Sequence, residues 1–188
     1  TVAGCGQAAP TAVPTEQPSE PVVPMAISEV SFLADDGLAV NGRYYKAEQP
    51  KAIILLFHQA DSSLAEYATI APKLVAQGYS VLAIDQRSGG SMFGPNQTAS
   101  RYGKNATFNG ALHDLEAALI WSRSAHLPVI VWGSSYSGAL VFKLAERHST
   151  EIIALLAFSP GEYLGAGRPV AAAAAELTIP VYISVGSN

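Results

Sequence analysis

Six consecutive residues in the second half of the chain have the types and the order that could hold a reactive serine. They are Gly133, Ser134, Ser135, Tyr136, Ser137 and Gly138. An apolar run at 128–132 precedes them and predicts a buried strand, and an amphipathic run at 136–147 follows and predicts a helix. A tight strand-to-helix turn of this kind holds a serine nucleophile where a substrate can reach it. The pattern therefore predicts Ser135 as a nucleophile.

Such a turn crowds the backbone, so small residues are needed two positions before and two positions after the serine. Gly133 occupies the first position and Ser137 the second, where glycine is usual, and Gly138 lets the helix pack closely on the strand. We interpret Ser134 and Ser137 as parts of the turn. Because short glycine–serine patterns also arise by chance, the flanking strand and helix are what favour a functional site.

A serine hydroxyl is a weak nucleophile at its free pKa and needs a neighbouring base. The chain has four histidines. His58 ends an apolar run and is interpreted as structural, and His113 and His126 are interpreted as surface or core-edge residues. His148 lies too far along the predicted helix, since thirteen residues at about 1.5 Å each span about 20 Å.

Composition indicates one acidic globular domain. The chain has 188 residues, 49% of them hydrophobic, with a formal net charge of −4 and a pI near 5.5. This charge disfavours general nucleic-acid binding, and no run approaches the roughly 18 apolar residues that cross a bilayer. The histidines are dispersed and Cys5 is the single cysteine, so we expect neither a metal site nor a disulfide.

Residues 1–25 predict a lipid-anchored tether. The Val-Ala-Gly sequence before Cys5 resembles the end of a bacterial lipoprotein signal, in which the cysteine is lipidated. Residues 6–24 are rich in Pro, Ala, Thr, Glu and Gln and lack apolar periodicity, as in a solvated linker. We expect a membrane anchor on Cys5, in a bacterial cell envelope and facing the periplasm or the exterior. An ordinary disordered tail is the alternative.

The remaining chain, 26–188, alternates strand and helix patterns. Two runs at 27–34 and 38–46 flank an Asp-Asp-Gly turn and predict an antiparallel hairpin. Further strands are predicted at 52–57, 79–84, 128–132, 152–158 and 179–185, and helices at 64–77, 110–124, 136–147 and 170–176. Pro72 predicts a kink or two short segments in the first of these helices. The order predicts a three-layer α/β sandwich with a mostly parallel sheet.

Ligands of such sheets bind beyond the carboxyl ends of the strands. The loops at these ends are 58–63, 85–109 and 133–137. The second is long for a compact domain, which favours a functional role. Within it we interpret Asp85 and Arg87 as residues that fix the loop by hydrogen bonds. Contact with solvent is the default for the charges of Arg87, Arg101 and Lys104, and binding of an acidic substrate group by these cations is the alternative.

Together these segments resemble the α/β-hydrolase superfamily and, within it, the small dienelactone-hydrolase-like esterases. The matching segments are 54–63, 71–90 and 129–140, and the resemblance covers 27–188. It implies hydrolysis of esters or related acyl compounds by a nucleophile, a histidine and an acid. Dienelactone hydrolases have a cysteine nucleophile, whereas the matching residue here is Ser135. We expect no cofactor.

The resemblance also implies which groups bind the oxyanion of the reaction. One donor is the backbone N–H of Tyr136, directly after the nucleophile. The other comes from the loop after the 52–57 strand, with Ala60 as the first choice and Gln59 as the second. Gln59 replaces the usual glycine, and its side chain would either supplement or obstruct the site.

In this superfamily the catalytic acid follows the strand predicted at 179–185, and the catalytic histidine follows one strand later. The chain ends at Asn188 and has no histidine after His148. We therefore expect a C-terminally incomplete α/β-hydrolase domain, whose acid, histidine, last strand and last helix lie beyond Asn188. A polypeptide of this length should be almost inactive, unless His58 on a neighbouring strand replaces the base.

The sequence thus predicts a serine hydrolase that cleaves small or medium carboxylic esters through an acyl-enzyme on Ser135. Two alternatives remain open: a non-catalytic binding module with the same fold, and a peptidase of the same fold. Fold alone does not choose between these chemistries. The expected partners are a small-molecule ester and a membrane, and nucleic acid is not expected.

Overall fold

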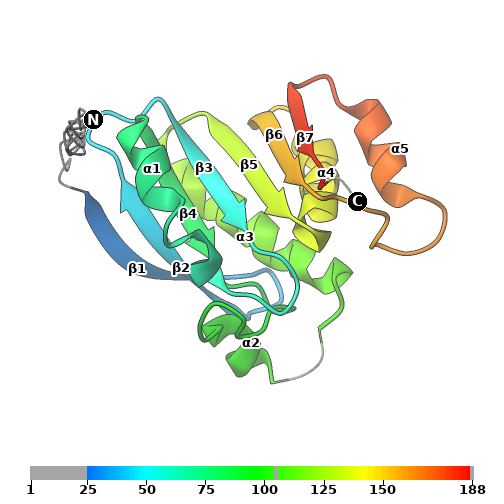
Figure 1. Cartoon of the computed structure of the whole chain (residues 1–188), viewed down its shortest axis with the longest axis horizontal. Helices are drawn as coiled ribbons and strands as arrows, with labels where there is room; N and C mark the ends of the chain where they lie inside the picture. The colour runs from blue at the N-terminus through cyan, green and yellow to red at the C-terminus, as the bar shows by residue number, and fades with distance from the viewer. Residues whose placement is uncertain (1–24, 104–105, 187–188) are drawn as a thin grey trace, which may run out of the picture.

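The computed structural model describes residues 25–103 and 106–186, so Cys5 and nearly all of the predicted tether lie outside it. Figure 1 shows a sheet with helices packed on it. The strands are β1 Ala26–Leu33, β2 Ala39–Lys46, β3 Ala52–Phe57, β4 Tyr79–Ile84, β5 Val129–Ser134, β6 Ile152–Phe158 and β7 Val181–Ser184. The helices are η1 Leu64–Tyr67, α1 Ala71–Ala76, α2 Gln97–Tyr102, η2 Asn109–Ala111, α3 Leu112–Ser122, η3 Arg123–Ala125, α4 Tyr136–Arg147 and α5 Pro169–Glu176, where η marks a 3-10 helix. None of the helices in the described ranges is long and apolar enough to span a membrane.

All seven of these strands form one sheet, in the order β1-β2-β4-β3-β5-β6-β7. β2 pairs antiparallel with β1 and with β4, and the other neighbours pair in parallel. Every residue of the central strand β3 is buried, as expected where both faces of a parallel sheet are covered. The prediction of a mostly parallel α/β sandwich that begins with a hairpin is confirmed.

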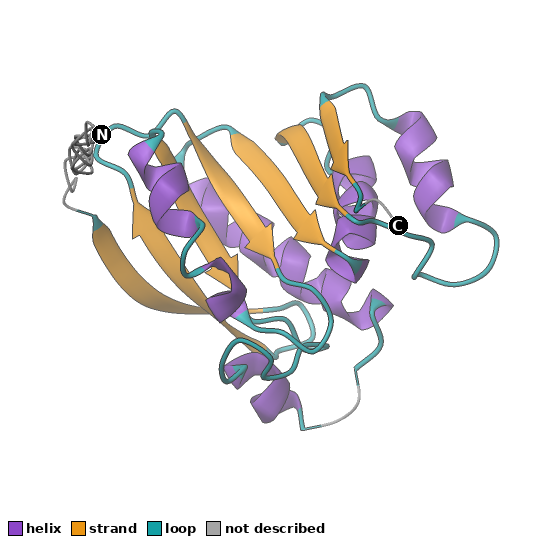
Figure 2. Cartoon of the chain, in the orientation of Figure 1, coloured by secondary structure: helices purple, strands orange, loops and turns teal. Residues whose placement is uncertain are grey.

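Two hydrophobic layers hold the helices on the sheet. On one face, side chains such as Leu55 of β3 pack in a cluster with α3 and α4, which contribute residues such as Leu140. On the other face, Ile54 packs with Tyr67 of η1 and with residues of α1. Figure 2 shows α1 on one side of the sheet and α3 and α4 on the other. Alternate residues of one strand therefore belong to different halves of the core.

Two segments show where the chain follows and where it departs from its predicted elements. The helix predicted at 64–77 consists of η1 and α1, with Pro72 in the first turn of α1, where its missing N–H removes no intrahelical bond. The loop predicted at 85–109 contains the helix α2. The Asn96 side chain caps α2 at its start, and Gly103, with φ 64°, ends it. Only Thr98 of α2 is buried, so there is no apolar periodicity from which to predict this helix.

The edge strand β7 exposes apolar side chains. Tyr182 is 57% exposed and Ile183 is 54% exposed, and no residue of β7 is buried. Parallel strands normally read as continuous apolar runs because both of their faces are covered. β7 has the apolar composition of such a strand, but the described residues leave its side chains exposed.

Candidate active site

Ser135 forms the turn between β5 and α4. Its backbone has φ 54° and ψ −121°, a conformation that residues with a side chain rarely adopt. β5 ends at Ser134 and α4 begins at Tyr136, so the chain reverses within a single residue. The Ser135 side chain is half-buried, and no described residue forms a hydrogen bond with its Oγ atom. The hydroxyl is therefore available to a ligand.

The closeness of this turn restricts Gly133. A Cβ atom at Gly133 would lie 2.2 Å from the carbonyl oxygen of Ser137, so no side chain fits there. A Cβ atom at Gly138 would lie 3.3 Å from the carbonyl oxygen of Gly133, a close contact that a small shift of the backbone could relieve. The need for a small residue two positions before Ser135 thus has a direct steric cause.

Parallel pairing brings three strand ends to the same edge of the sheet. Phe57 of β3 pairs with Gly133 of β5, and Ser134 pairs with Phe158 of β6. The backbone N–H of Ser135 donates to the Phe158 carbonyl at 2.8 Å. Residues 58–63, which we call the β3 loop, therefore lie beside the start of α4.

Of the three backbone N–H groups predicted as oxyanion donors, two lack an acceptor in the described part of the chain. Tyr136 is the first residue of α4, where an N–H has no intrahelical partner. The N–H of Ala60 in the β3 loop has no acceptor either. The N–H of Gln59, in contrast, donates to Glu66 Oε2 at 3.1 Å. The N–H groups of Tyr136 and Ala60 therefore remain candidate oxyanion donors, whereas the N–H of Gln59 is excluded because Glu66 already accepts it.

His58 is buried and has partners at both ring nitrogens. Its Nε2 accepts the backbone N–H of Gln86 at 3.0 Å, so its Nδ1 carries the proton and donates to the Gln59 carbonyl at 2.7 Å. Burial away from water lowers the pKa of His58 to about 4. No hydrogen bond joins His58 to Ser135. This arrangement favours a structural role over the alternative in which His58 serves as the base.

Asp85 and Arg87 are tied into the fold at the start of the 85–109 segment. The Asp85 carboxylate accepts the first N–H of η1 at 2.9 Å and the first N–H of α2 at 2.7 Å. Arg87 donates to Asp114 at 2.9 Å and to Asp36 at 3.0 Å. The hydrogen bonds from Arg87 hold the pKa of Asp36 at about 2. Both residues fix the loop, in agreement with their interpretation from the sequence.

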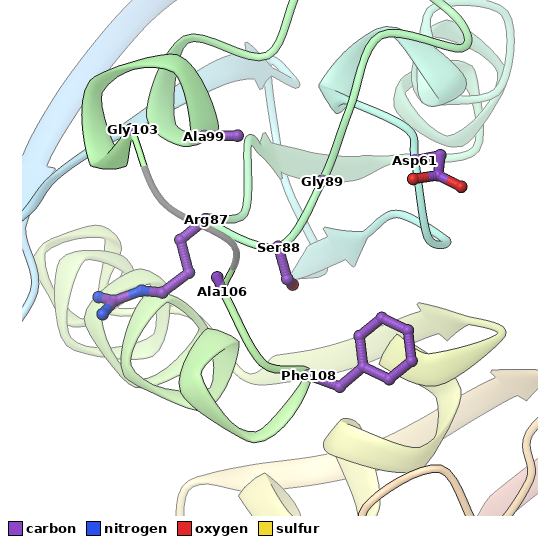
Figure 3. Close-up of a pocket in the computed structure, with 8 residues that line it drawn as sticks. All are labelled: Asp61, Arg87, Ser88, Gly89, Ala99, Gly103, Ala106 and Phe108. Carbon is purple, nitrogen blue, oxygen red and sulfur yellow. The ribbon is translucent and has the colours of Figure 1, made fainter.

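A cavity of about 660 Å³ opens beside the start of α4. It is lined by Asp61, Arg87, Ser88, Gly89, Ala99, Gly103, Ala106 and Phe108 (Figure 3). Ser135 does not line it, but Tyr136 contacts two residues that do. The Phe108 ring stacks on the Tyr136 ring with 4.3 Å between centroids, and Ser88 Oγ donates to Tyr136 Oη at 2.8 Å. The cavity is thus adjacent to the turn that carries the candidate nucleophile.

The two arginines of the 85–109 segment form hydrogen bonds with protein partners. In Figure 3 the Arg87 guanidinium points away from Ser88 and Phe108. Arg101 donates to Asn41 Oδ1 at 2.8 Å, and Lys104 lies outside the described residues. The geometry at Arg87 and Arg101 therefore disfavours the alternative in which they bind an acidic substrate group.

None of the other described histidines forms a hydrogen bond with Ser135. Nδ1 of His113 lies 2.6 Å from Asp35 Oδ1. Together with Glu116 these two residues form the one group of three potential metal ligands within residues 25–103 and 106–186. Glu116 is paired with Arg147 at 2.7 Å. Because each carboxylate of this group already has a protein partner, the group does not indicate a metal site.

Four residues near the turn were not anticipated from the sequence: Gln86, Ser88, Asn96 and Phe108. Gln86 and Ser88 both bind Tyr136 Oη, and Asn96 Nδ2 donates to the Gln86 carbonyl at 3.0 Å. All four lie in the 85–109 segment, whose length indicated a functional role. No spacing rule shows which side chains of an irregular segment turn inward, so the length was the only usable signal.

The family model described as serine aminopeptidase, S33, matches residues 48–188. The chain belongs to this family. It is therefore an α/β-hydrolase, and its family supports a hydrolase activity. No curated protein matches the chain in sequence.

Solved structures of esterases are similar in fold. An esterase of Pyrococcus furiosus has a TM-score of 0.66 at 19% identity, over 85% of this chain and 70% of that chain. A zinc-bound, cold-adapted esterase from an Arctic intertidal metagenomic library has a TM-score of 0.62 at 22% identity, over 86% of this chain and 70% of that one. A carboxyl esterase of Bacillus coagulans, in complex with glycerol, has a TM-score of 0.60 at 21% identity, over 71% of this chain. This chain spans only 44% of the Bacillus coagulans chain.

Proposed function

We propose that this hydrolase cleaves small or medium carboxylic esters through an acyl-enzyme on Ser135. The observation that carries the proposal is the conformation of Ser135, whose φ of 54° places a free hydroxyl at the start of α4. The esterases among the similar structures support the choice of an ester. The narrower assignment to the dienelactone-hydrolase-like esterases remains a prediction of the sequence.

In the proposed reaction, Ser135 Oγ attacks the ester carbonyl carbon while a base takes its proton. The carbonyl oxygen becomes an oxyanion that accepts hydrogen bonds from the N–H groups of Tyr136 and Ala60. The carbon–oxygen bond then breaks, the alcohol leaves with a proton, and water hydrolyses the acyl-enzyme. The cavity lined by Ser88 and Phe108 would hold part of the substrate beside the reacting carbon.

We place the base and its acid in further chain that packs on β7. The support is the exposed apolar surface of β7, including Tyr182 at 57% and Ile183 at 54% exposure. A strand and a helix on this surface would complete the parallel sheet. The lipid anchor on Cys5 and a location in the bacterial cell envelope also remain proposals, drawn from the sequence alone.

The test compares ester and peptide substrates in the protein extended beyond Asn188 as its gene encodes it. We expect hydrolysis of p-nitrophenyl acetate and butyrate, and a loss of kcat of about 10⁴-fold or more in Ser135→Ala. Ser124→Ala, an exposed serine of η3, is the matched control and should retain wild-type activity. Equal activity in Ser135→Ala and the wild type would contradict the proposal.

A peptidase is the second candidate, because the matching family model is described as a serine aminopeptidase. An aminoacyl p-nitroanilide hydrolysed faster than the esters, and dependent on Ser135, would favour it. The non-catalytic alternative predicts no Ser135-dependent turnover of either substrate.

A further inference from the structure

Gln86 connects the β3 loop to the start of α4. The residue is completely buried. Its side-chain Nε2 donates to Tyr136 Oη and to Ser137 Oγ, both at 2.8 Å. Its backbone N–H donates to His58 Nε2 at 3.0 Å. One buried residue thus binds both segments from which oxyanion donors are proposed.

Ser137 extends this link to the backbone of the β3 loop. Its Oγ lies 2.6 Å from the carbonyl oxygen of His58 and can only donate to it. A hydroxyl has one proton, so toward Gln86 the Ser137 oxygen must act as acceptor. The direction of both hydrogen bonds is therefore determined, and the Gln86 amide must present its N–H₂ group to Ser137. This hydroxyl stands where the turn would usually have glycine.

These bonds fix two successive peptide planes. In a trans peptide the C=O and the N–H point in opposite directions. Ser137 holds the His58 carbonyl, and the N–H of the same peptide, on Gln59, points to Glu66 at 3.1 Å. His58 Nδ1 holds the Gln59 carbonyl at 2.7 Å, so the N–H of that peptide, on Ala60, must point the other way. This Ala60 N–H has no acceptor among the described residues.

Packing alone does not account for a glutamine at this position. Gln86 Oε1 is buried without a hydrogen-bond partner in the described structure. A buried carbonyl oxygen without a partner costs free energy, and methionine would fill a similar volume without that cost. Local arrangements that cost stability are expected mainly at functional sites.

We propose that Gln86 and Ser137 are positioning residues that hold the Ala60 N–H in place for the oxyanion. The inference rests on the proposed function of Ser135. Gln86 acts through Ser137 and through His58, and neither Gln86 nor the Ser137 hydroxyl contacts the substrate.

The first experiment measures the link without any activity, by hydrogen exchange on the 188-residue chain. In both Gln86→Met and Ser137→Ala, we expect amide exchange in residues 58–63 to rise roughly 10-fold. Ser137→Ala removes the hydrogen bond from α4 to the His58 carbonyl, and Gln86→Met removes the donor that orients the Ser137 hydroxyl for that bond. Exchange in β6 should not change. Gln77→Met, the same substitution at an exposed residue, is the matched control and should leave both segments as in the wild type. Unchanged exchange in residues 58–63 of both variants would overturn the proposal.

The second experiment measures p-nitrophenyl acetate hydrolysis by the protein extended beyond Asn188. We expect kcat to fall about 10- to 100-fold in Gln86→Met with little change in KM, because a displaced donor weakens binding of the transition state more than of the substrate. The double variant with Ser137→Ala should be about as slow as the slower single variant, since the two residues act in one chain of hydrogen bonds.

The outcomes separate this inference from the proposed function. If the wild type shows no Ser135-dependent activity, the proposed function is wrong. The exchange experiment alone then decides whether Gln86 and Ser137 hold the β3 loop. An active wild type with unchanged kcat in Gln86→Met overturns the positioning role. An effect on KM only, or losses that multiply in the double variant, also overturns it.

Discussion

Gly133 is the residue whose replacement the turn should tolerate least. Gly133→Ala would place a Cβ atom 2.2 Å from the Ser137 carbonyl oxygen, so β5 and α4 would have to separate. We expect a loss of about 3 kcal/mol in the free energy of unfolding, measured with urea. Gly186→Ala, where a Cβ meets nothing within 4 Å, is the control and should cost less than about 0.5 kcal/mol. Similar losses in the two variants would contradict the steric argument.

His58 should make stability depend on pH below neutrality. The folded protein holds it neutral down to a pKa of about 4, whereas its ordinary value is 6.5. Between these values the unfolded chain binds the proton more readily, so the free energy of unfolding falls as the pH drops, by about 1.4 kcal/mol per pH unit and about 3 kcal/mol in all. The contribution is complete above pH 6.5.

Urea unfolding of His58→Asn at several pH values checks this expectation. The free energy of unfolding of the variant should fall less steeply between neutral pH and pH 4. The variant lacks the imidazole that the folded state keeps neutral in this range. His126→Asn removes an exposed histidine and should keep the slope of the wild type. Parallel slopes in His58→Asn and the wild type would show that His58 is not held neutral.

Among the elements, Arg87 joins the end of β4 to α3 and to the β1–β2 turn. The side chain is 3% exposed and pairs with Asp114, which is 0% exposed, and with Asp36, which is 37% exposed. Asp114→Asn leaves a buried cation with one partner fewer, so we expect a loss of about 3 kcal/mol or more. Asp36→Asn removes a partner that water can replace and should cost at most about 1 kcal/mol. Equal losses in urea unfolding would contradict this difference in burial.

Elements with a strong local pattern could be predicted from the sequence, and those without one could not. The strand at 52–57 and the helix at 136–147 have the predicted bounds, because a continuous apolar run and a regular apolar stripe determine them. α2 was missed because its capping residues, Asn96 and Gly103, lie in a segment without apolar periodicity. The same reason explains why Gln86 could not be assigned a role. Its partners in the β3 loop and in α4 lie 28 to 51 residues away along the chain, and the parallel sheet brings them together.

For the molecule as a whole, the exposed surface of β7 is the feature with the largest expected consequence. Val181, Tyr182 and Ile183 of β7, and Val185 directly after the strand, are 40% to 67% exposed. The pattern of an apolar edge strand with unpaired backbone groups favours association between copies. We expect the 188-residue chain to show concentration-dependent association in sedimentation velocity, and further chain packed on β7 to reduce it.

A charge at the centre of this surface should oppose the association. Ile183→Lys would bring an ammonium group to the edge that a second copy would have to bury, so the chain should remain monomeric at higher concentrations. Ile120→Lys is the control, because Ile120 is 55% exposed but lies on α3, away from the sheet edge. If β7 is the contact, only Ile183→Lys lowers the weight-average sedimentation coefficient. If both substitutions act equally, general hydrophobicity and not the open edge of the sheet drives the association.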